Sequence, residues 1–512
     1  MQFTNFSKAL ADRNFPMEFP GHFIDGEWIK SPRTAEPKTT FNPSTGLKIL
    51  ETSLDRATID HAVNSLISRE QEIGSLTFDE RITLIEKFKR SLCEYKNLAI
   101  QAMEIGTGKP HWEAQSDFDS AVDYLNQLLE QRDFLEETII SAYGKTGSCK
   151  NIILTPIGAT AAYLPLFTPS VSFVQYLSAT ILAGCPLLLV SSAHGTLSGL
   201  LFAYLAQISE FPNGLLNVIY GSFSALLQTS KDKRIKAIIY KGSREHSETI
   251  RKESYMIAGR QLILQSGGKN SVIVDHSAKI DQAVQFVFWG ALKNAGQLCS
   301  STSRVLIPSS QKQEFLDALF SALKNMTIGP TDKEGDNPDM GPLYSKKAVD
   351  KFLKFQTMAQ REAEYTLYRG KIYETAKGGF FVTPAVHLMK KMDNTTAYQS
   401  NVLMFPDIAV YTYETLENAI ADANNTDSPY IVSFIGQRET IEPLRKKIMA
   451  PNLLINLPTT ELEANMPING KLYCGGHRLT GTGLLFFLTY PQAMLTSDVI
   501  MGDFKTWPKS KN

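Results

Sequence analysis

The chain has 512 residues, and its composition of 43% hydrophobic, 20% charged and 10% aromatic residues is that of a globular protein, which excludes disorder, collagen and coiled coil as whole-chain descriptions. At about 150 residues per domain, this length predicts two to four domains. Lysine plus arginine and aspartate plus glutamate each total 52, so the formal net charge is zero, and we expect neither nucleic acid nor an anionic membrane as a partner.

The chain begins with MQFTNFSKALADRNFPMEF, which lacks the apolar core of a secretory signal peptide. Its five cysteines are odd in number, widely spaced and without a C-x-x-C pair, which argues against a disulfide framework or a zinc module. We expect four of them to be buried as small apolar side chains: Cys93, Cys149, Cys185 and Cys474. Both features predict a cytoplasmic protein in a reducing compartment.

Residues 151–207 contain no Asp, Glu, Lys or Arg. A membrane-spanning helix needs about 20 consecutive, predominantly apolar residues. Here Pro165, Pro169, Gly184 and Pro186 interrupt the stretch, and its longest clean apolar run, ILAGCPLLLV, is too short. We therefore predict a buried strand, helix and strand, and no membrane span.

Apolar strands alternate with amphipathic helices along much of the chain, a pattern that indicates parallel α/β architecture. Strands are predicted at 152–156, 161–165, 186–190, 216–221, 236–240, 271–275, 304–308, 405–413 and 452–457. Helices with apolar residues at three- and four-residue spacings are predicted at 170–184, 196–211 and 312–326.

Two segments depart from this alternation. One is the region of about 125–150, a helix-like run that ends in the turn GKTGS. The other is LLFFLTY at 484–490, which we interpret as a strand that needs a cover, because exposed apolar strands aggregate. We assign both segments to an interface between subunits, and the alternative is a strand covered within its own chain.

The strongest candidate for chemistry is the stretch NAGQLCSSTSRV at 294–305, which lies between a predicted helix and the strand RVLIP. A free cysteine is ordinarily a buried apolar residue. Cys299, however, lies in a Gly-Gln loop at the edge of an α/β core, where it is a candidate nucleophile.

This stretch resembles the active-site loop of the aldehyde dehydrogenase superfamily, in which the cysteine of an N-x-G-Q-x-C motif attacks the aldehyde. Further segments resemble that family in the same order along nearly the whole chain: FIDGEWIKS, FNPSTG, EIGTGKPHWEA, LLNVIYG, IIYKGS, LQSGGKNSVIV, MGPLYS, LLIN and CGGHRLTGTG. The ending, with TYPQAML, is most similar to the succinylglutamate-semialdehyde dehydrogenase branch.

The resemblance implies an aldehyde dehydrogenase-like α/β fold in three parts. A Rossmann-type cofactor-binding domain is expected at 1–124 and 151–263, and a catalytic domain that carries the thiol at 264–482. An oligomerisation segment is expected at 125–150 and 483–505. The same resemblance implies a homodimer or homotetramer, a small aldehyde or ester as the substrate of an active protein, and no metal.

In the family, a glutamate activates water to hydrolyse the thioester formed on the cysteine, and an asparagine binds the oxyanion. Here the general-base position is Gln265, whose amide has no useful basicity, and the oxyanion position is Phe167, whose side chain donates no hydrogen bond. Losing a base costs about 10²–10⁴ in rate and losing one oxyanion donor about 10²–10³, although such losses need not multiply.

The family binds NAD or NADP through charged partners of the two riboses, and these positions are Val190, Ala193 and Val402 here. At about 1.5–3 kcal/mol for each charged hydrogen bond, their replacement removes roughly 4–9 kcal/mol. That loss is comparable with the whole binding free energy of a micromolar ligand, about 8 kcal/mol. We therefore predict weak or absent cofactor binding.

Gly242 and Ser243 of IIYKGSREH match the family's turn beneath the pyrophosphate. The N-terminus of the following helix can attract a phosphate, but a purely structural turn explains the two residues equally well. For the glycines of GGKN and CGGHRLTGTG we favour backbone geometry at positive φ.

Three hypotheses for function follow. The first is a degenerate member of the superfamily that keeps the Cys299 thiol and acts as a binding or regulatory protein. The second is an active NAD(P)-dependent dehydrogenase that oxidises an aldehyde or semialdehyde to an acid through a Cys299 thioester. The third is cofactor-independent hydrolysis of an ester or thioester by Cys299.

Overall fold

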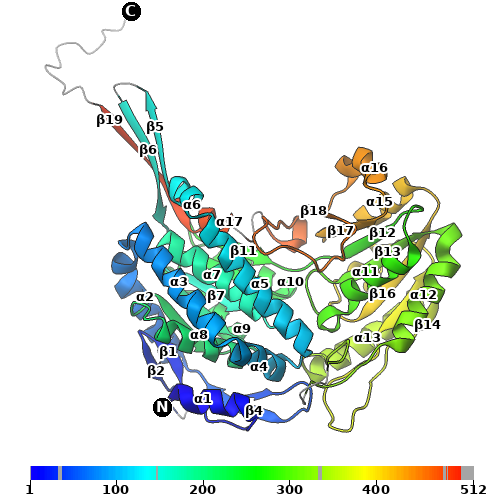
Figure 1. Ribbon diagram of the computed structural model, residues 1–512, viewed down its shortest axis with the longest axis horizontal. Coiled ribbons are helices and arrows are strands. Elements are labelled where there is room, and N and C mark those ends of the chain that lie inside the picture. The colour runs from blue at the N-terminus through cyan, green and yellow to red at the C-terminus, as the bar shows by residue number, and fades with distance from the viewer. Residues whose placement is uncertain are drawn as a thin grey trace, which may run out of the picture.

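The computed structural model describes residues 2–32, 37–145, 148–331, 337–476, 480 and 483–497, without the side chains of 2, 138, 140–145, 148–151 and 495–497. Two large sheets, each with helices packed on it, form the body of the molecule (Figure 1). A third, narrow sheet projects from the first of them. This mixed α/β arrangement with parallel-sheet domains confirms the predicted fold class.

The N-terminal sheet has seven strands in the order β11-β10-β7-β8-β9-β1-β2. The first five run parallel, whereas β1 lies antiparallel to β9 and forms a hairpin with β2. Their bounds are β11 Gln261–Gln265, β10 Ala237–Lys241, β7 Thr160–Leu164, β8 Leu187–Ser191, β9 Leu216–Tyr220, β1 His22–Ile24 and β2 Glu27–Ile29. Strands β8 and β9 are buried at every residue, as continuous apolar runs in parallel sheets are, because helices cover both faces.

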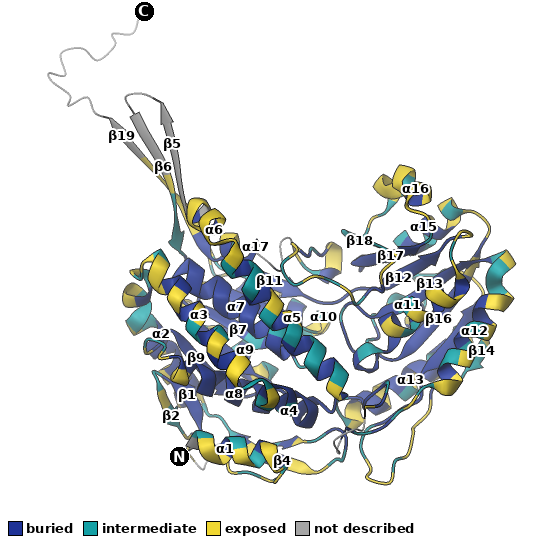
Figure 2. Cartoon of the chain, in the orientation of Figure 1, coloured by how far each residue is buried: buried dark blue, intermediate teal, exposed yellow. Residues whose placement is uncertain are grey.

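Helices pack against this sheet and bury two apolar clusters with it (Figure 2). They are α1 Gln2–Ala11, α2 Arg56–Gly74, α3 Phe78–Glu94, α4 Lys96–Thr107, α5 His111–Glu130, α6 Arg132–Ile139, α7 Pro169–Ala183, α8 Thr196–Ile208, α9 Phe223–Thr229 and α10 Arg244–Ser254. A separate hairpin pairs β3 (Pro37–Phe41) with β4 (Lys48–Ser53). The charge-free stretch forms buried strands and helices from β7 onward, whereas its first strand at 152–156 is exposed or half-buried. No helix among the described residues is long and apolar enough to cross a membrane.

The C-terminal sheet has seven strands in the order β14-β15-β16-β13-β12-β17-β18. Only β14 is antiparallel to its neighbour. The bounds are β14 Ala363–Tyr368, β15 Ala385–Met389, β16 Asp407–Tyr413, β13 Thr302–Pro308, β12 Asn270–Val274, β17 Ile431–Ile435 and β18 Asn452–Ile455. Its helices are α11 Ile280–Leu292, α12 Lys312–Asn325, α13 Lys346–Glu362, α14 Ala397–Ser400, α15 Leu416–Asn424 and α16 Arg438–Ile441, with short 3-10 turns η1 Lys293–Gly296, η2 Ser309–Gln311, η3 Glu442–Lys447 and η4 Leu472–Cys474.

The narrow third sheet is antiparallel, in the order β19-β6-β5. Its strands are β5 Ile140–Lys145, β6 Ser148–Pro156 and β19 Thr489–Ser497. The helix-like run predicted for about 125–150 therefore ends at Ile139 and gives way to strands. The parts of the predicted oligomerisation segment at 146–147 and 498–505 lie outside the described residues.

The predicted strand at 484–490 is wrong over most of its length, because residues 483–487 form the short helix α17 and β19 begins only at Thr489. The apolar run suits either conformation. Leu484, Leu485 and Leu488 are buried in the N-terminal core, so they are covered within their own chain.

The prediction of four buried cysteines is also wrong at one position. The side chain of Cys93 is exposed, because it lies on α3 next to Leu92, which faces the core. Cys185 and Cys474 are buried as expected, and the side chain of Cys149 is outside the described part. The four described cysteines are free thiols.

Candidate active site

A cavity of about 810 Å³ is lined by residues from both large sheets and their loops. Three of the residues singled out by the sequence for catalysis, Cys299, Gln265 and Phe167, line this one cavity. Gly242, Ser243 and Val402 line it as well. The fold therefore brings together positions that lie far apart in the sequence.

Cys299 lies in the turn between η1 and β13 and is partly exposed. The chain reaches it through three successive residues with positive φ, namely Asn294 at 54°, Ala295 at 50° and Gly296 at 67°. A side chain at Gly296 would lie 2.3 Å from the backbone of Phe405, so this loop requires a glycine there.

The segment between β11 and β12 holds this loop through hydrogen bonds. Asn270 Nδ2 donates to the carbonyl oxygen of Cys299 at 3.0 Å and to that of Ser301 at 2.9 Å. The backbone N–H of Gly268 also donates to the Cys299 carbonyl, at 3.3 Å. These bonds fix the cysteine against the strand that carries Gln265.

Gln265 is the last residue of β11, a strand that crosses the domain boundary predicted between 263 and 264. Its Nε2 lies 3.6 Å from the sulfur of Cys299 and 2.5 Å from the hydroxyl of Tyr430. An amide, which is neutral at any physiological pH, thus occupies the place beside the thiol.

The two glycines after this strand have different structural roles. Gly267 has a φ of +75°, as the sequence predicts, and an added Cβ would lie 3.4 Å from the Cβ of Cys299. No positive φ explains Gly268. Instead, a Cβ there would lie 2.1 Å from that of Tyr430, so this glycine makes room for the tyrosine. In CGGHRLTGTG, Gly475 has the predicted positive φ, at 125°.

Phe167 lies between β7 and α7, and its ring makes an edge contact with Tyr344 at 6.1 Å. Its backbone carbonyl accepts a hydrogen bond of 2.6 Å from Nζ of Lys109. The phenyl group therefore contributes an apolar surface at the position where the resemblance implies a hydrogen-bond donor.

The cavity lining also includes a buried polar cluster formed by Lys109, Glu113 and Asp117. Burial raises the pKa of Glu113 to about 7, against the opposing effect of Lys109, and it also raises the pKa of Asp117. Burial lowers the pKa of Lys109. Glu113 Oε2, Asp117 Oδ1 and Asn294 Oδ1 are buried acceptors without a hydrogen-bond partner among the described residues.

The three positions expected to contact ribose carry apolar side chains that differ in burial and surroundings. Val190 is fully buried in the core between β8 and its helices. Ala193 is half-buried, and its backbone carbonyl accepts hydrogen bonds from Thr40 and Thr196. Val402, which is half-buried, lines the cavity.

The turn at Gly242 and Ser243 makes hydrogen bonds with its own neighbours. The hydroxyl of Tyr240 accepts the backbone N–H of Ser243 at 3.1 Å, and the hydroxyl of Ser243 accepts that of His246 at 3.3 Å. A Cβ at Gly242 would lie 2.3 Å from the Tyr240 hydroxyl, which explains the glycine. Phe223 stacks on the His246 ring at 3.6 Å, between α9 and α10.

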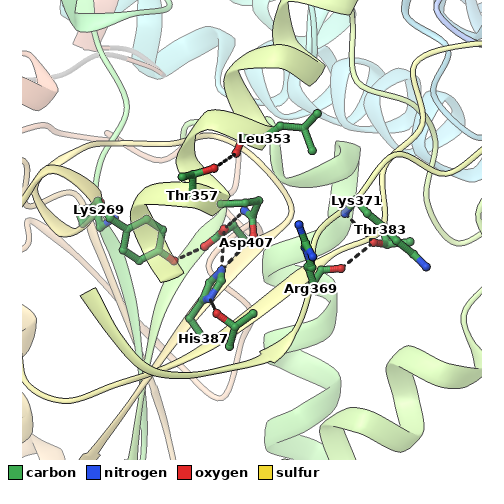
Figure 3. Close-up of polar contacts among 11 residues, drawn as sticks. Lys269, Leu353, Thr357, Arg369, Lys371, Thr383, His387 and Asp407 are labelled. Carbon is green, nitrogen blue, oxygen red and sulfur yellow. Dashed lines mark hydrogen bonds and ion pairs between the residues drawn. The ribbon is translucent and has the colours of Figure 1, made fainter. Parts of the chain in front are cut away.

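A buried polar network surrounds Asp407, the first residue of β16, five residues after Val402 (Figure 3). The hydroxyl of Tyr398 and Nε2 of Gln356 donate to the carboxylate of Asp407, and His387 Nε2 lies 3.1 Å from Gln356 Oε1. Burial alone would raise the pKa of Asp407, but the hydrogen bond from His387, with those from Tyr398 and Gln356, outweighs it and lowers the pKa.

Lys269 lies at the other end of this network, with its ammonium group 5.4 Å from the centre of the Tyr398 ring. Its Nζ donates to the carbonyl oxygens of Tyr398 at 3.4 Å and Asn401 at 2.9 Å, directly before Val402. Burial, together with the nearby charge of Arg304, lowers the pKa of Lys269 to about 7.

Sequence reasoning missed Lys109, Asn270 and Tyr430 as residues of this site. The first two lie in EIGTGKPHWEA and LQSGGKNSVIV, segments that carry the family resemblance, so their motifs were a usable signal. Tyr430 lies just before β17, 165 residues from Gln265, and no spacing or motif pointed to it.

Comparison with known proteins identifies relatives of this chain. Curated relatives include a hydroxyisobutyraldehyde dehydrogenase of Mycolicibacterium austroafricanum, 25% identical over 91% of this chain and 90% of that protein. Another is the N-succinylglutamate 5-semialdehyde dehydrogenase of Escherichia coli O157:H7, 24% identical over 93% of this chain and 95% of the relative.

Solved structures share the fold. A 1-pyrroline-5-carboxylate dehydrogenase of Thermus thermophilus superposes with a TM-score of 0.87 at 20% identity, over 97% of this chain and 96% of its own. A betaine aldehyde dehydrogenase of Staphylococcus aureus, solved in complex with NAD+, superposes with a TM-score of 0.87 at 20% identity, over 96% of this chain and 99% of its own. The model of the aldehyde dehydrogenase family matches residues 28–493, a span that includes the five parallel strands of the N-terminal sheet, the whole C-terminal sheet and the Cys299 loop. The chain therefore belongs to the aldehyde dehydrogenase family.

Proposed function

We propose that this family member no longer oxidises aldehydes and acts as a binding or regulatory protein through the cavity around Cys299. The observation that carries the proposal is the Gln265 amide, 3.6 Å from the Cys299 sulfur at the position where the family has its general base. An amide cannot take a proton from water, so hydrolysis of a thioester at this site loses its base.

The fit of a nicotinamide cofactor supports the same proposal. Val190 is enclosed in the core, and the backbone N–H groups of Ser243 and His246 are already bound by Tyr240 and Ser243. A helix N-terminus attracts a phosphate through such N–H groups. The described residues therefore do not fit the cofactor in the way the resemblance implies, and we derive no step through it.

Binding an aldehyde requires none of the lost groups. When a thiol adds to an aldehyde, the C–S bond forms, the carbonyl π bond breaks, and the proton of the thiol ends on the new alkoxide oxygen. The addition is reversible and consumes no oxidant. Cys299 lines the cavity, and Glu113, Asp117 and Asn294 are among its other lining residues, so an aldehyde that carries polar groups suits it.

Titration calorimetry of the purified protein tests the proposal. We expect no binding of NAD or NADP at sub-millimolar concentration, because the loss of three charged hydrogen bonds removes roughly 4–9 kcal/mol. A small aldehyde should bind to the wild-type protein, and this signal should disappear in Cys299→Ala.

The active dehydrogenase is the competing candidate, and a direct assay separates the two. A dissociation constant for either cofactor of tens of micromolar or tighter would overturn the proposal. So would reduction of NAD or NADP by the wild-type protein with any small aldehyde, if Cys299→Ala abolishes it. Steady hydrolysis of an ester without cofactor would instead favour the hydrolase.

A further inference from the structure

We infer that Glu113 is a positioning residue of this site: its carboxyl group, which belongs to the N-terminal domain, holds the turn at 294–296 that leads into Cys299. Glu113 acts through the backbone of this turn, by a contact that the folded chain makes without a cofactor or an aldehyde. Its effect on aldehyde binding, which is tested last, rests on the proposed function.

A hydrogen bond joins Glu113 to the turn across 181 residues of sequence. Oε1 of Glu113 accepts the backbone N–H of Asn294 at 2.5 Å. Glu113 lies in the first turn of α5, a helix of the N-terminal domain, whereas Asn294 lies in η1, directly after α11 of the C-terminal domain. One turn further along α5, Oγ of Ser116 accepts a hydrogen bond from Nζ of Lys293 at 3.4 Å. The same helix therefore contacts two successive residues of η1.

The turn has a backbone conformation that its residues do not favour by themselves. Asn294 and Ala295 have φ angles of 54° and 50°, a region that residues with a Cβ rarely adopt. Such a backbone persists where surrounding contacts hold it. Nε2 of Gln297 donates to the carbonyl oxygens of Asn294 at 2.9 Å and of Pro342 at 3.3 Å. Asn294 is thus held at its carbonyl by Gln297 and at its N–H by Glu113.

The carboxyl group of Glu113 is enclosed together with several charged groups. Glu113 is 1% exposed, and its second oxygen, Oε2, has no hydrogen-bond partner among the described residues. Lys109 from the loop before α5 and Lys293 from η1 face it, and Asp117, one turn further along α5, also interacts with Lys109. Burial raises the pKa of Glu113 to about 7, against the opposing effects of Lys109, the N–H of Asn294 and Lys293.

The strength of the contact between Glu113 and Asn294 therefore depends on pH near neutrality. A carboxylate accepts a stronger hydrogen bond than a neutral carboxylic acid does. Because Glu113 is a carboxylate above its pKa of about 7, its hold on the turn strengthens as pH rises through this value and weakens as pH falls. Burial also lowers the pKa of Lys109 and raises that of Asp117, so a variant of Glu113 itself must separate its contribution from theirs.

Hydrogen exchange of the full chain, followed by peptide mass spectrometry, measures this hold. We expect Glu113→Ala to raise the exchange rate of the peptide that contains 294–296 about 10-fold at about pH 8, because a hydrogen bond to a charged acceptor is lost. Glu113→Gln keeps a neutral acceptor and should cause a smaller increase. After correction for intrinsic exchange rates, the wild-type peptide should exchange faster at about pH 6 than at about pH 8, and Glu113→Gln should lose this difference.

Glu104→Ala is the matched control, because Glu104 is also a buried acid of the N-terminal domain but contacts Arg13 and His111. It should leave exchange at 294–296 as in the wild type. Equal exchange in Glu113→Ala and the wild type would overturn the positioning role. If Glu113→Ala does not fold, the comparison of Glu113→Gln with the wild type decides, and a pH difference that persists in Glu113→Gln counts against Glu113.

Titration of the protein with propanal provides the functional measurement. The dissociation constant should be about 10-fold or more weaker in Glu113→Ala than in the wild type, because a displaced thiol adds less readily to the carbonyl carbon. An unchanged affinity in Glu113→Ala, with faster exchange at 294–296, would show that this turn does not place Cys299 and would overturn the inference. A wild-type protein that binds no aldehyde would instead overturn the proposed function, and hydrogen exchange would still decide whether Glu113 holds the turn.

Discussion

At the scale of single residues, the chemistry around Cys299 depends on two neighbouring residues, Gln265 and Phe167, and both can be replaced by mutation. Gln265→Glu with Phe167→Asn places a base and an oxyanion donor beside the thiol. We expect hydrolysis of an activated ester to rise about 100-fold or more, on the magnitudes measured for these two groups in other enzymes. Release of a chromogenic phenol under steady-state conditions measures it.

Control variants separate the recovery of ester hydrolysis from that of aldehyde oxidation. Aldehyde oxidation should remain undetectable in the double variant and should require the addition of Val190→Lys, Ala193→Glu and Val402→Glu. Adding Cys299→Ala to the double variant should abolish the new esterase activity. If ester hydrolysis stays at the wild-type rate while the double variant folds and its Cys299 is alkylated, the absence of a base is not what limits the site.

Residue identities alone predicted some of this site and not the rest. Cys299 and Gln265 are 34 residues apart, and only the family resemblance indicated that they meet. Tyr430 is 165 residues from Gln265, and it reaches the site because β17 pairs with β12. The order of strands in a sheet is a tertiary property that neither hydrophobic period nor local motif encodes.

At the scale of elements, His22 joins three strands of the N-terminal domain. Its Nδ1 accepts the backbone N–H of Tyr220 in β9 at 3.1 Å, and its Nε2 donates to the carbonyl of Ser53 in β4 at 2.8 Å. The neutral ring satisfies both strands, and burial lowers its pKa from 6.5 to about 4.

This shift predicts a pH dependence of stability. Because the folded pKa is depressed, the unfolded chain binds a proton first as pH falls, so the contribution of His22 is complete above pH 6.5 and is lost between pH 6.5 and about 4. The loss amounts to roughly 3 kcal/mol. Urea unfolding at several pH values should show that the free energy of unfolding falls less over this interval in His22→Gln than in the wild type.

The matched control is His61→Gln, because His61 is exposed on α2. Its free energy of unfolding should follow the wild-type pH dependence. If His22→Gln retains the full fall in stability between pH 6.5 and 4, other groups cause it and the neutral ring of His22 does not.

Most elements of the two large sheets follow from sequence patterns, because buried parallel strands have continuous apolar runs with helices between them. β8, β9 and β10 lie within one residue of their predicted bounds. The strand predicted for the segment LLFFL is wrong because five apolar residues are compatible with a helix turn and with a strand equally. The segment's contacts with α7 in the N-terminal core decide for the helix, and these are not local.

At the scale of the whole molecule, the three-stranded sheet bears on how copies of the chain associate. Strands β5 and β19 form its two edges, and Met494 of the edge strand β19 exposes 42% of its surface, next to the central strand β6, where Ile152 exposes 37%. Edge strands with apolar residues favour pairing with another chain. We therefore expect light scattering to report a dimer or a dimer of dimers of the 57.0 kDa chain at micromolar concentration.

A charge on this sheet tests where the subunits meet. Met494→Glu should shift the population toward the monomer, because a carboxylate loses its hydration in an apolar interface. Met449→Glu is the control, since Met449 is exposed to a similar extent, 40%, on the C-terminal domain. A wild-type monomer, or equal dissociation by the two variants, would contradict this interface.

The pairing of β19 with β6 also dictates the order in which the molecule can be built. Thr155 and Tyr490 are joined by a hydrogen bond although they are 335 residues apart in the sequence. A ribosome that adds about 5–20 residues each second needs roughly 20 to 70 seconds between the two strands. Until then β5 and β6 form an isolated hairpin, which is marginally stable at best. The nascent chain therefore carries an unfinished sheet for most of its synthesis, and this is the interval in which a chaperone or a misfolded neighbour would meet it.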